Sequence, residues 1–200
     1  MSDQPRKPFL YIIVCAAGNA GDVGKLITAA QEQQWDVGVI ATPQGLGFID
    51  ADAVSARTGY PVRSAWRRPG EARPFPTADA MVVAPATFNT INKWAAGIAD
   101  TLAVATLCEA YGAGVPTVVL PSVNADLAAH PAYRASVERL RGMGVLFASD
   151  THAEAPESES ESESESESES GDGNGDAPAP FRWERALELL APAAAGGGRS

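Results

Sequence analysis

Short apolar runs rich in β-branched residues alternate along this chain with segments of helical periodicity. Runs of this kind, without polar alternation, are typical of strands buried on both faces of a parallel sheet. The alternation therefore predicts an α/β fold, a single three-layer Rossmann-like domain with a mostly parallel sheet. The predicted strands are 9–16, 36–41, 80–84, 117–120 and 145–148, and the predicted helices are roughly 20–34, 52–58, 89–96, 101–111 and 131–141.

The acidity of the chain is concentrated in one segment. The formal net charge is −10, but eleven of the 25 acidic residues lie between Asp150 and Ala179, a stretch without Lys or Arg. The remainder is nearly neutral. Residues 157–170 are seven Glu-Ser pairs and contain no apolar side chain whose burial could offset the entropy of ordering. We expect a domain over 9–149, a disordered acidic linker over 150–180, and a C-terminal helix over 181–190 that packs on the domain.

Composition argues against several classes of partner. The densest basic stretch, 63–73, is interrupted by Pro69 and Glu71, so we expect no nucleic acid. The longest apolar run has nine residues, whereas a membrane-spanning helix needs about 20, so we expect no membrane insertion. Cys15 and Cys108 form no CxxC pattern, and with two His there is no metal-site spacing. A reduced, cytoplasmic protein without a metal is predicted.

A glycine-containing loop, GNAGDVG at 18–24, follows the first predicted strand. Backbone N–H groups at such a strand-to-helix turn can bind an anion. The spacing is GxxGxxG rather than GxGxxG, and the second strand ends in Ala41-Thr42 rather than in an acidic residue. These features favour a phosphate-bearing mononucleotide over NAD, with the Thr42 hydroxyl as a donor to the phosphate. A plain strand-to-helix turn explains the glycines equally well.

Two further polar segments follow predicted strands. PATFNTINKWAAGIAD (85–100) presents Thr87, Asn89 and Thr90 beside a strand end, where ligands bind in parallel sheets. The alternative is a helix N-cap by Thr87 or Asn89, which accounts for one of these groups but not for all three. In the segment that begins PSVN (121–124), Asn124 should face the same edge, although an isolated loop Asn is usually a turn residue.

Together, these segments resemble the superfamily of homo-oligomeric flavin-containing cysteine decarboxylases, which includes phosphopantothenoylcysteine decarboxylase and the lantibiotic peptide decarboxylases. PATFNT followed by GIAD resembles the PASANT motif of that family, PSVN resembles its PxMN motif, and TGYPV (58–62) is also similar. The resemblance covers about 9–149 and the C-terminal FxW helix. It implies FMN, which in the family oxidises a thiol to a thioaldehyde that readily loses CO₂, and a flavin site built between the subunits of a trimer or a multiple of it.

The resemblance also assigns residues. It implies that FMN is held by Gly18, Asn19, Thr42, Pro85, Ala86, Thr87 and Asn89. It implies that Asn124 binds the carboxylate of the substrate. The catalytic His of the family precedes the Ala-Asp of the third strand. Counting back from Asp79 places Glu71 there, as a base or, alternatively, as a solvated loop residue.

Other departures from the family concern the substrate. Val123 replaces the Met of PxMN, Leu127-Ala128 replaces a Met-Trp pair, and the Glu-Ser repeat lies where the family has a substrate-covering segment. His130 is expected to be a rim residue. The sequence thus predicts an FMN-binding flavoprotein of the cysteine-decarboxylase type, acting on an unknown small carboxylated or cysteine-containing substrate or with altered chemistry. The alternatives are a non-catalytic flavin-binding regulatory or partner subunit and a cofactor-free structural domain.

Overall fold

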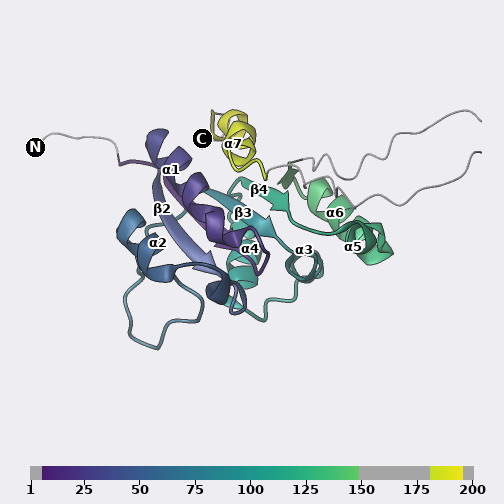
Figure 1. Ribbon diagram of the computed structural model, residues 1–200, viewed down its shortest axis with the longest axis horizontal. Coiled ribbons are helices and arrows are strands. Elements are labelled where there is room, and N and C mark those ends of the chain that lie inside the picture. The colour runs from purple at the N-terminus through teal and green to yellow at the C-terminus, as the bar shows by residue number, and fades with distance from the viewer. Residues whose placement is uncertain (1–5, 149–180, 196–200) are drawn as a thin grey trace, which may run out of the picture.

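A computed structural model describes residues 6–148 and 181–195 of the chain. Its centre is a five-stranded sheet of order β2-β1-β3-β4-β5 in which every pairing is parallel (Figure 1). The strands are β1 (Phe9–Val14), β2 (Asp36–Ala41), β3 (Ala80–Ala86), β4 (Thr117–Pro121) and β5 (Leu146–Phe147). The predicted α/β fold with a parallel sheet is confirmed.

Helical segments connect the strands and close the two faces of the sheet. They are η1 (Ala20–Val23), α1 (Gly24–Glu32), η2 (Gly45–Phe48), α2 (Ala51–Thr58), α3 (Phe88–Ala95), α4 (Leu102–Gly112), α5 (Ala125–Ala129), α6 (Pro131–Gly142) and α7 (Arg185–Ala195). Among the described residues, no helix is both long enough and apolar enough to span a membrane.

Two hydrophobic cores lie on opposite faces of the sheet, because successive side chains of a strand point to opposite sides. Leu10 and Ile12 of β1 pack in one core with α1, α2 and α7. Phe9 and Ile13 pack in the other core with α3, α4 and α6. The resulting helix–sheet–helix sandwich is the predicted three-layer architecture (Figure 1).

The third and fourth strands extend beyond their predicted ends at 84 and 120, each through a proline. β3 continues through Pro85 to Ala86, and β4 includes Pro121, which pairs with Ala86. A proline lacks the backbone donor but keeps its acceptor. The carbonyl of Pro85 accepts the Cys15 N–H at 3.2 Å, so the strand remains tied to the segment that follows β1.

The C-terminal segment packs on the sheet, as predicted, but its helix begins later than predicted. α7 starts at Arg185 and ends at Ala195, whereas Phe181 and Trp183 lie in a preceding turn. The two rings meet edge to face at 4.7 Å, and Trp183 is 2% exposed. Phe181 and Trp183 are apolar because they pack against the domain from the segment before the helix. Their spacing therefore resembled a helical pattern although they lie outside α7. The acidic segment 150–180 lies outside the described residues, and its disorder stays a prediction.

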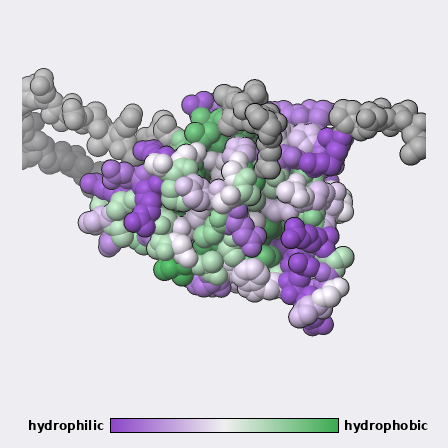
Figure 2. Space-filling view, turned by 180° about the vertical axis from the view of Figure 1, so that it is seen from behind, coloured by the Kyte–Doolittle hydropathy of each residue, from purple (hydrophilic) through white to green (hydrophobic). Residues whose placement is uncertain are grey.

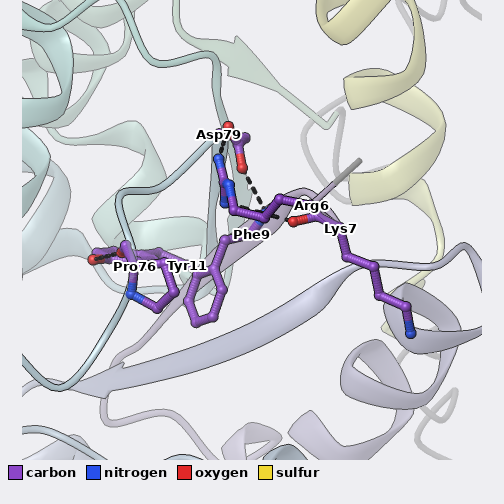
Figure 3. A network of polar contacts seen from close by, with 6 residues as sticks. All are labelled: Arg6, Lys7, Phe9, Tyr11, Pro76 and Asp79. Carbon is purple, nitrogen blue, oxygen red and sulfur yellow. Dashed lines mark hydrogen bonds and ion pairs between the residues drawn. The ribbon is translucent and has the colours of Figure 1, made fainter. Parts of the chain in front are cut away.

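A polar network anchors the start of β1 at the amino edge of the sheet (Figure 3). The Asp79 carboxylate accepts the Phe9 N–H at 2.7 Å and the Arg6 guanidinium at 2.9 Å. The Tyr11 hydroxyl donates to the carbonyl of Pro76 at 2.7 Å, and burial raises the pKa of that hydroxyl. These bonds hold the end of the 64–79 loop at the amino ends of β1 and β3, which is the end of the sheet opposite to the predicted site.

Candidate functional site

The strand order creates a topological switch point between β1 and β3. The chain leaves β1 toward β2 on one side and reaches β3 on the other, so the loops after these two strands run in opposite directions, and ligands bind at such a point in open α/β sheets. All residues predicted to hold the cofactor, and Asn124, follow β1, β2, β3 or β4 or end β3 (Figure 1). The structure therefore brings them to the end of the sheet where the strands have their carboxyl termini, which we call the rim.

Asn19 and Ser122 join two distant parts of the rim. The Ser122 hydroxyl donates to Asn19 Oδ1 at 3.3 Å, and the Ser122 N–H donates to the carbonyl of Ala86 at 2.8 Å. One residue thus ties the loops after β1 and β4 to the last residue of β3. With its oxygen engaged by Ser122, the Asn19 carboxamide has its N–H donors left for a ligand.

Thr42 is a buried polar residue at the end of β2, where it is 7% exposed. Its hydroxyl oxygen accepts the Gly45 N–H at 3.0 Å, and its own N–H donates to the carbonyl of Val14 at 2.8 Å. A Cβ at Gly45 would lie 2.7 Å from that carbonyl and 2.8 Å from the Thr42 hydroxyl. The turn after β2 is therefore tight, and the Thr42 hydroxyl keeps its proton available for donation.

The turn after β1 is open by comparison. A Cβ at Gly18 would meet nothing within 4 Å. Among the described residues, the N–H groups of Gly18 and Asn19 have no hydrogen-bond acceptor. Unpaired backbone donors beside free space are what an anionic group such as a phosphate requires. The open turn thus agrees with the phosphate loop predicted from the glycines.

The first turn of α3 lies at the rim beside the end of β1. Thr87 occupies the N-cap position, one of the two cap positions that the sequence left open, but its side chain makes no capping bond. Its hydroxyl donates instead to Thr90 Oγ1 at 3.2 Å, and the Cys15 thiol donates to the same oxygen at 3.2 Å. The N–H groups of Phe88 and Asn89 therefore receive no side-chain cap, and the exposed Asn89 side chain is free to contact a ligand.

Asn124 is exposed at the rim and begins a short helix that the sequence analysis missed. Its Oδ1 accepts the Leu127 N–H at 2.9 Å, which makes it the N-cap of α5. The helix has five residues, too few for a periodic signal, although an Asn before Ala-Asp is a recognisable cap. The bond leaves the amide N–H groups of Asn124 as donors, so the cap and a carboxylate-binding role are compatible.

Glu71 lies on an exposed turn of the 64–79 loop, and its hydrogen bonds stay within that loop. Its carboxylate accepts the Arg68 N–H at 3.0 Å, and its carbonyl accepts a bond from Arg67. Figure 2 shows hydrophilic side chains gathered where this loop protrudes. The structure does not bring Glu71 into contact with the other predicted site residues. In this chain the carboxylate holds the turn.

Aromatic side chains at the rim were not predicted from the sequence. Phe88 stacks on Tyr133 with ring centroids 6.0 Å apart and meets His130 edge to face at 5.7 Å. His130 is a rim residue, as predicted, and its Nδ1 accepts the Ala132 N–H at the start of α6. The cluster joins α3 to α6. The sequence analysis also missed Ser122 and Cys15. Each directly follows a strand, and this position could have marked it as a candidate for the site.

A parallel sheet of this order defines a Rossmann-like α/β domain, and the unpaired donors and amides at its switch point suit a small anionic ligand. The chain belongs to the Flavoprotein family, whose model matches residues 2–169. Membership of this family supports a flavin cofactor. The donors at the rim fit such a group, because its phosphate and ring edges need backbone and amide partners.

Comparisons with individual proteins point to decarboxylases. A prokaryotic cysteine/cysteine sulfinic acid decarboxylase, of unknown organism, is 38% identical over 81 residues, which is 40% of this chain and 20% of that protein. The coenzyme A biosynthesis bifunctional protein CoaBC of Mycobacterium tuberculosis is 32% identical over 151 residues, 73% of this chain and 35% of that protein. The chain thus spans about a third or less of these curated relatives.

Solved structures extend the likeness to the whole fold. The FMN-dependent cysteine decarboxylase SpaF aligns with a TM-score of 0.61 and 25% identity, over 71% of this chain and 83% of that chain. The FMN binding protein AtHal3, at 23% identity and a TM-score of 0.58, shares the fold.

Proposed function

We propose that this chain binds FMN at the rim and acts as an FMN-dependent, decarboxylase-like enzyme on a small carboxylated or cysteine-containing substrate. The observation that carries the proposal is the convergence of four strand-end loops at the switch point of a Flavoprotein-family domain. The loops are tied together there by Ser122, through Asn19 and Ala86, and by the bond from Cys15 to Pro85.

The chain's own residues divide into groups that would bind different parts of FMN. Gly18, Asn19 and Thr42 offer N–H and hydroxyl donors of the kind that a phosphate needs. Pro85 and Ala86 end β3, and Thr87 and Asn89 lie at the start of α3; this junction, which we call the β3–α3 turn, would hold the ring system. When bound, FMN supplies two-electron oxidation chemistry, whereas the residues of the chain bind and orient it.

Asn124 is proposed to hold the carboxylate of the substrate. Because its Oδ1 is engaged by the Leu127 N–H, its side chain presents N–H donors rather than an acceptor. Donors suit a carboxylate, and an acceptor would repel it. Glu71 remains the proposed base, and that role requires its carboxylate to leave Arg68 or to reach the rim of another copy.

We further propose that the chain assembles into a trimer or a multiple of it. Leu46, Phe48 and Leu127 are large apolar residues that are 37–48% exposed, and all three follow the carboxyl ends of strands. The apolar residues Ile91 and Trp94 of α3 are buried within the chain and offer no surface for a second copy. A second copy over the rim would cover the three exposed residues and one side of the flavin.

An absorption spectrum of purified protein, followed by mass spectrometry of the released cofactor, tests FMN binding. We expect a flavin spectrum and the mass of FMN. Colourless protein that also fails to take up FMN at micromolar concentration would refute the proposal, and so would released FAD or NAD. Light scattering tests the assembly. A mass of at least about three times 20.8 kDa is expected, and a monomer with full flavin occupancy contradicts it.

Release of CO₂ from cysteine-terminated substrates tests catalysis. We expect slow turnover of phosphopantothenoylcysteine, because general-base catalysis is worth roughly 10²–10⁴-fold and Glu71 is held within its loop. Glu71→Gln and Asn124→Ala should each lower turnover of the true substrate, and Asn124→Ala should also raise its KM. Flavin binding without turnover of any carboxylated substrate would instead indicate a non-catalytic subunit.

A further inference from the structure

Cys15 directly follows β1 and lies under the rim rather than on it. Its side chain is 1% exposed, and it belongs to the core that β1 and β3 share with α3 and α4. Its backbone N–H donates to the carbonyl of Pro85 at 3.2 Å. The residue therefore touches the β3–α3 turn, in which every residue from Pro85 to Thr87 is a proposed flavin contact.

The thiol begins a hydrogen-bonded path from the core to the rim. Cys15 Sγ–H donates to Thr90 Oγ1 at 3.2 Å, and Thr90 is itself 4% exposed. The hydroxyl of Thr87, which is partly exposed at the rim, donates to the same Thr90 oxygen at 3.2 Å. Two buried polar groups, the Cys15 thiol and the Thr90 hydroxyl, are thus linked to one partly buried hydroxyl at the start of α3.

Apolar packing alone does not explain this arrangement. A buried hydroxyl without a partner costs about 1–3 kcal/mol, so a threonine at position 90 is favourable only if its neighbours bond to it. The neighbours here are the Cys15 thiol and the Thr87 hydroxyl. Because the Thr87 hydroxyl bonds inward to Thr90, it does not cap α3, and its oxygen keeps lone pairs that can accept a bond from a ligand.

Burial also keeps the thiol in its neutral form. It raises the pKa of Cys15, while hydrogen bonding with Thr90 and Thr87 acts in the opposite direction. A neutral thiol can donate, as the bond to Thr90 requires, whereas a thiolate can only accept. The hydrogen bonds that link Cys15, Thr90 and Thr87 are therefore intact at neutral pH.

We propose that Cys15 is a positioning residue of the flavin site: through Thr90 it fixes the Thr87 hydroxyl and the first turn of α3 toward the cofactor. This inference rests on the proposed function, since it assumes that the β3–α3 turn contacts FMN. Cys15 itself does not touch the cofactor in this assignment. Its thiol acts through Thr90, and Thr87 is the group that meets the ligand.

The test measures FMN affinity by fluorescence quenching, and the flavin absorption spectrum, for a set of full-length variants. Cys15→Ala and Thr90→Val should each weaken binding about fivefold, the equivalent of one lost hydrogen bond, and should shift the visible bands of the bound flavin. Cys15→Ser keeps a donor and should bind within about twofold of the wild type. Cys108→Ala, a matched cysteine in α4 away from the path, should change neither quantity.

A double-mutant cycle separates positioning from mere stability. In a Thr87→Val background, Cys15→Ala should weaken FMN binding no further, because the hydroxyl it orients is already gone. If Cys15→Ala costs the same affinity in both backgrounds, or costs none in the wild type, the inference is wrong. Where Cys15→Ala fails to fold, Thr90→Val and Cys15→Ser carry the same test, and equal binding by Thr90→Val and the wild type overturns it.

The outcome also distinguishes this inference from the proposed function. Wild-type protein that binds no FMN refutes the proposed function before any variant is measured. Wild-type protein that binds FMN, together with a folded Cys15→Ala variant of unchanged affinity and unchanged spectrum, leaves the proposed function intact and refutes the positioning role alone.

Discussion

Asn19 Oδ1 accepts a hydrogen bond from the Ser122 hydroxyl at 3.3 Å, although 103 positions separate the two residues in the sequence. The bond crosses the end of β3, whose last residue, Ala86, accepts the Ser122 N–H. Because the loops after β1 and β4 are joined in this way, a substitution in the loop after β4 should change the affinity of a ligand bound by the loop after β1.

Ser122→Ala should weaken FMN binding about fivefold. The substitution removes the hydroxyl that orients the Asn19 carboxamide, at a cost of about 1 kcal/mol. Titration with FMN measures the loss, and Ser122→Thr should restore most of it. Ser64→Ala, in a different loop, serves as the control and should bind like the wild type. Equal affinities for Ser122→Ala and the wild type would show that Asn19 needs no such support.

Asn89→Asp should weaken FMN binding about tenfold or more, because it places a carboxylate beside the flavin. The same substitution should not lower the melting temperature, since an acidic residue in the first turn of α3 interacts favourably with the helix dipole. Fluorescence titration and calorimetry measure the two effects separately. Asn89→Ser is the neutral control. A variant that binds FMN normally would remove Asn89 from the site.

Two glycines of the rim should respond to alanine in opposite ways. Gly45→Ala should lower the free energy of unfolding by about 1–3 kcal/mol, because its Cβ would lie 2.7 Å from the carbonyl of Val14. Gly18→Ala meets no atom within 4 Å and should leave stability unchanged while it narrows the space for the phosphate and weakens FMN binding. Urea denaturation and FMN titration distinguish them, with Gly47→Ala as a control for both.

Stability should decline in alkaline solution. Burial raises the pKa of the Cys15 thiol above its ordinary value of 9.0 and that of the Tyr11 hydroxyl above 10.0. The unfolded chain then releases these protons at lower pH than the folded chain. The free energy of unfolding therefore keeps its full value below about pH 9 and falls as the pH rises further.

Urea denaturation across this pH range measures the slope. Cys15→Ser should flatten the decline above about pH 9, and Tyr11→Phe the decline above about pH 10, because the new side chains do not titrate there. Tyr111→Phe, at an exposed tyrosine, is the control. A slope that is the same in Cys15→Ser as in the wild type would contradict the assignment to the thiol.

Deleting 157–170 should leave folding and flavin content nearly unchanged. The segment lies outside the described residues, and it has no apolar side chain to bury, while its seven glutamates repel one another. Thermal denaturation and the ratio of flavin to protein absorbance measure the effect. Replacement by a Gly-Ser segment of equal length controls for linker length. A fall of the melting temperature by more than about 3 °C would indicate a structural role.

Local sequence patterns accounted for most elements of this fold. The runs that became β1 and β2 are apolar throughout because both faces of each strand are buried, and that composition is visible without any neighbour. Errors arose where a neighbour changed the meaning of a residue. Pro85 lies beyond the predicted third strand, 80–84, yet β3 continues through it and its carbonyl accepts the Cys15 N–H. Trp183 was assigned to a helix, yet it is buried from a turn.

The candidate site divides in the same way. Gly18, Thr42 and Asn89 could be predicted from the sequence, because each follows a recognisable strand and has a side chain, or lacks one, suited to a ligand. The roles of Ser122 and of Thr90 could not. Each depends on a hydrogen bond to a residue at least 75 positions away, Ser122 to Asn19 and Thr90 to Cys15.

The sequence by itself determined the layers and the parallel sheet, because the alternation of buried strands with helices is visible in short-range patterns of apolar residues. Only the tertiary structure decided that Ser122 and Thr90 hydrogen-bond to residues of the candidate site or beneath it, and that Glu71 bonds within its own loop. Hydrogen bonds are directional and act over about 3 Å, so their partners are set by how loops meet in space, and no local pattern in a single sequence encodes that meeting.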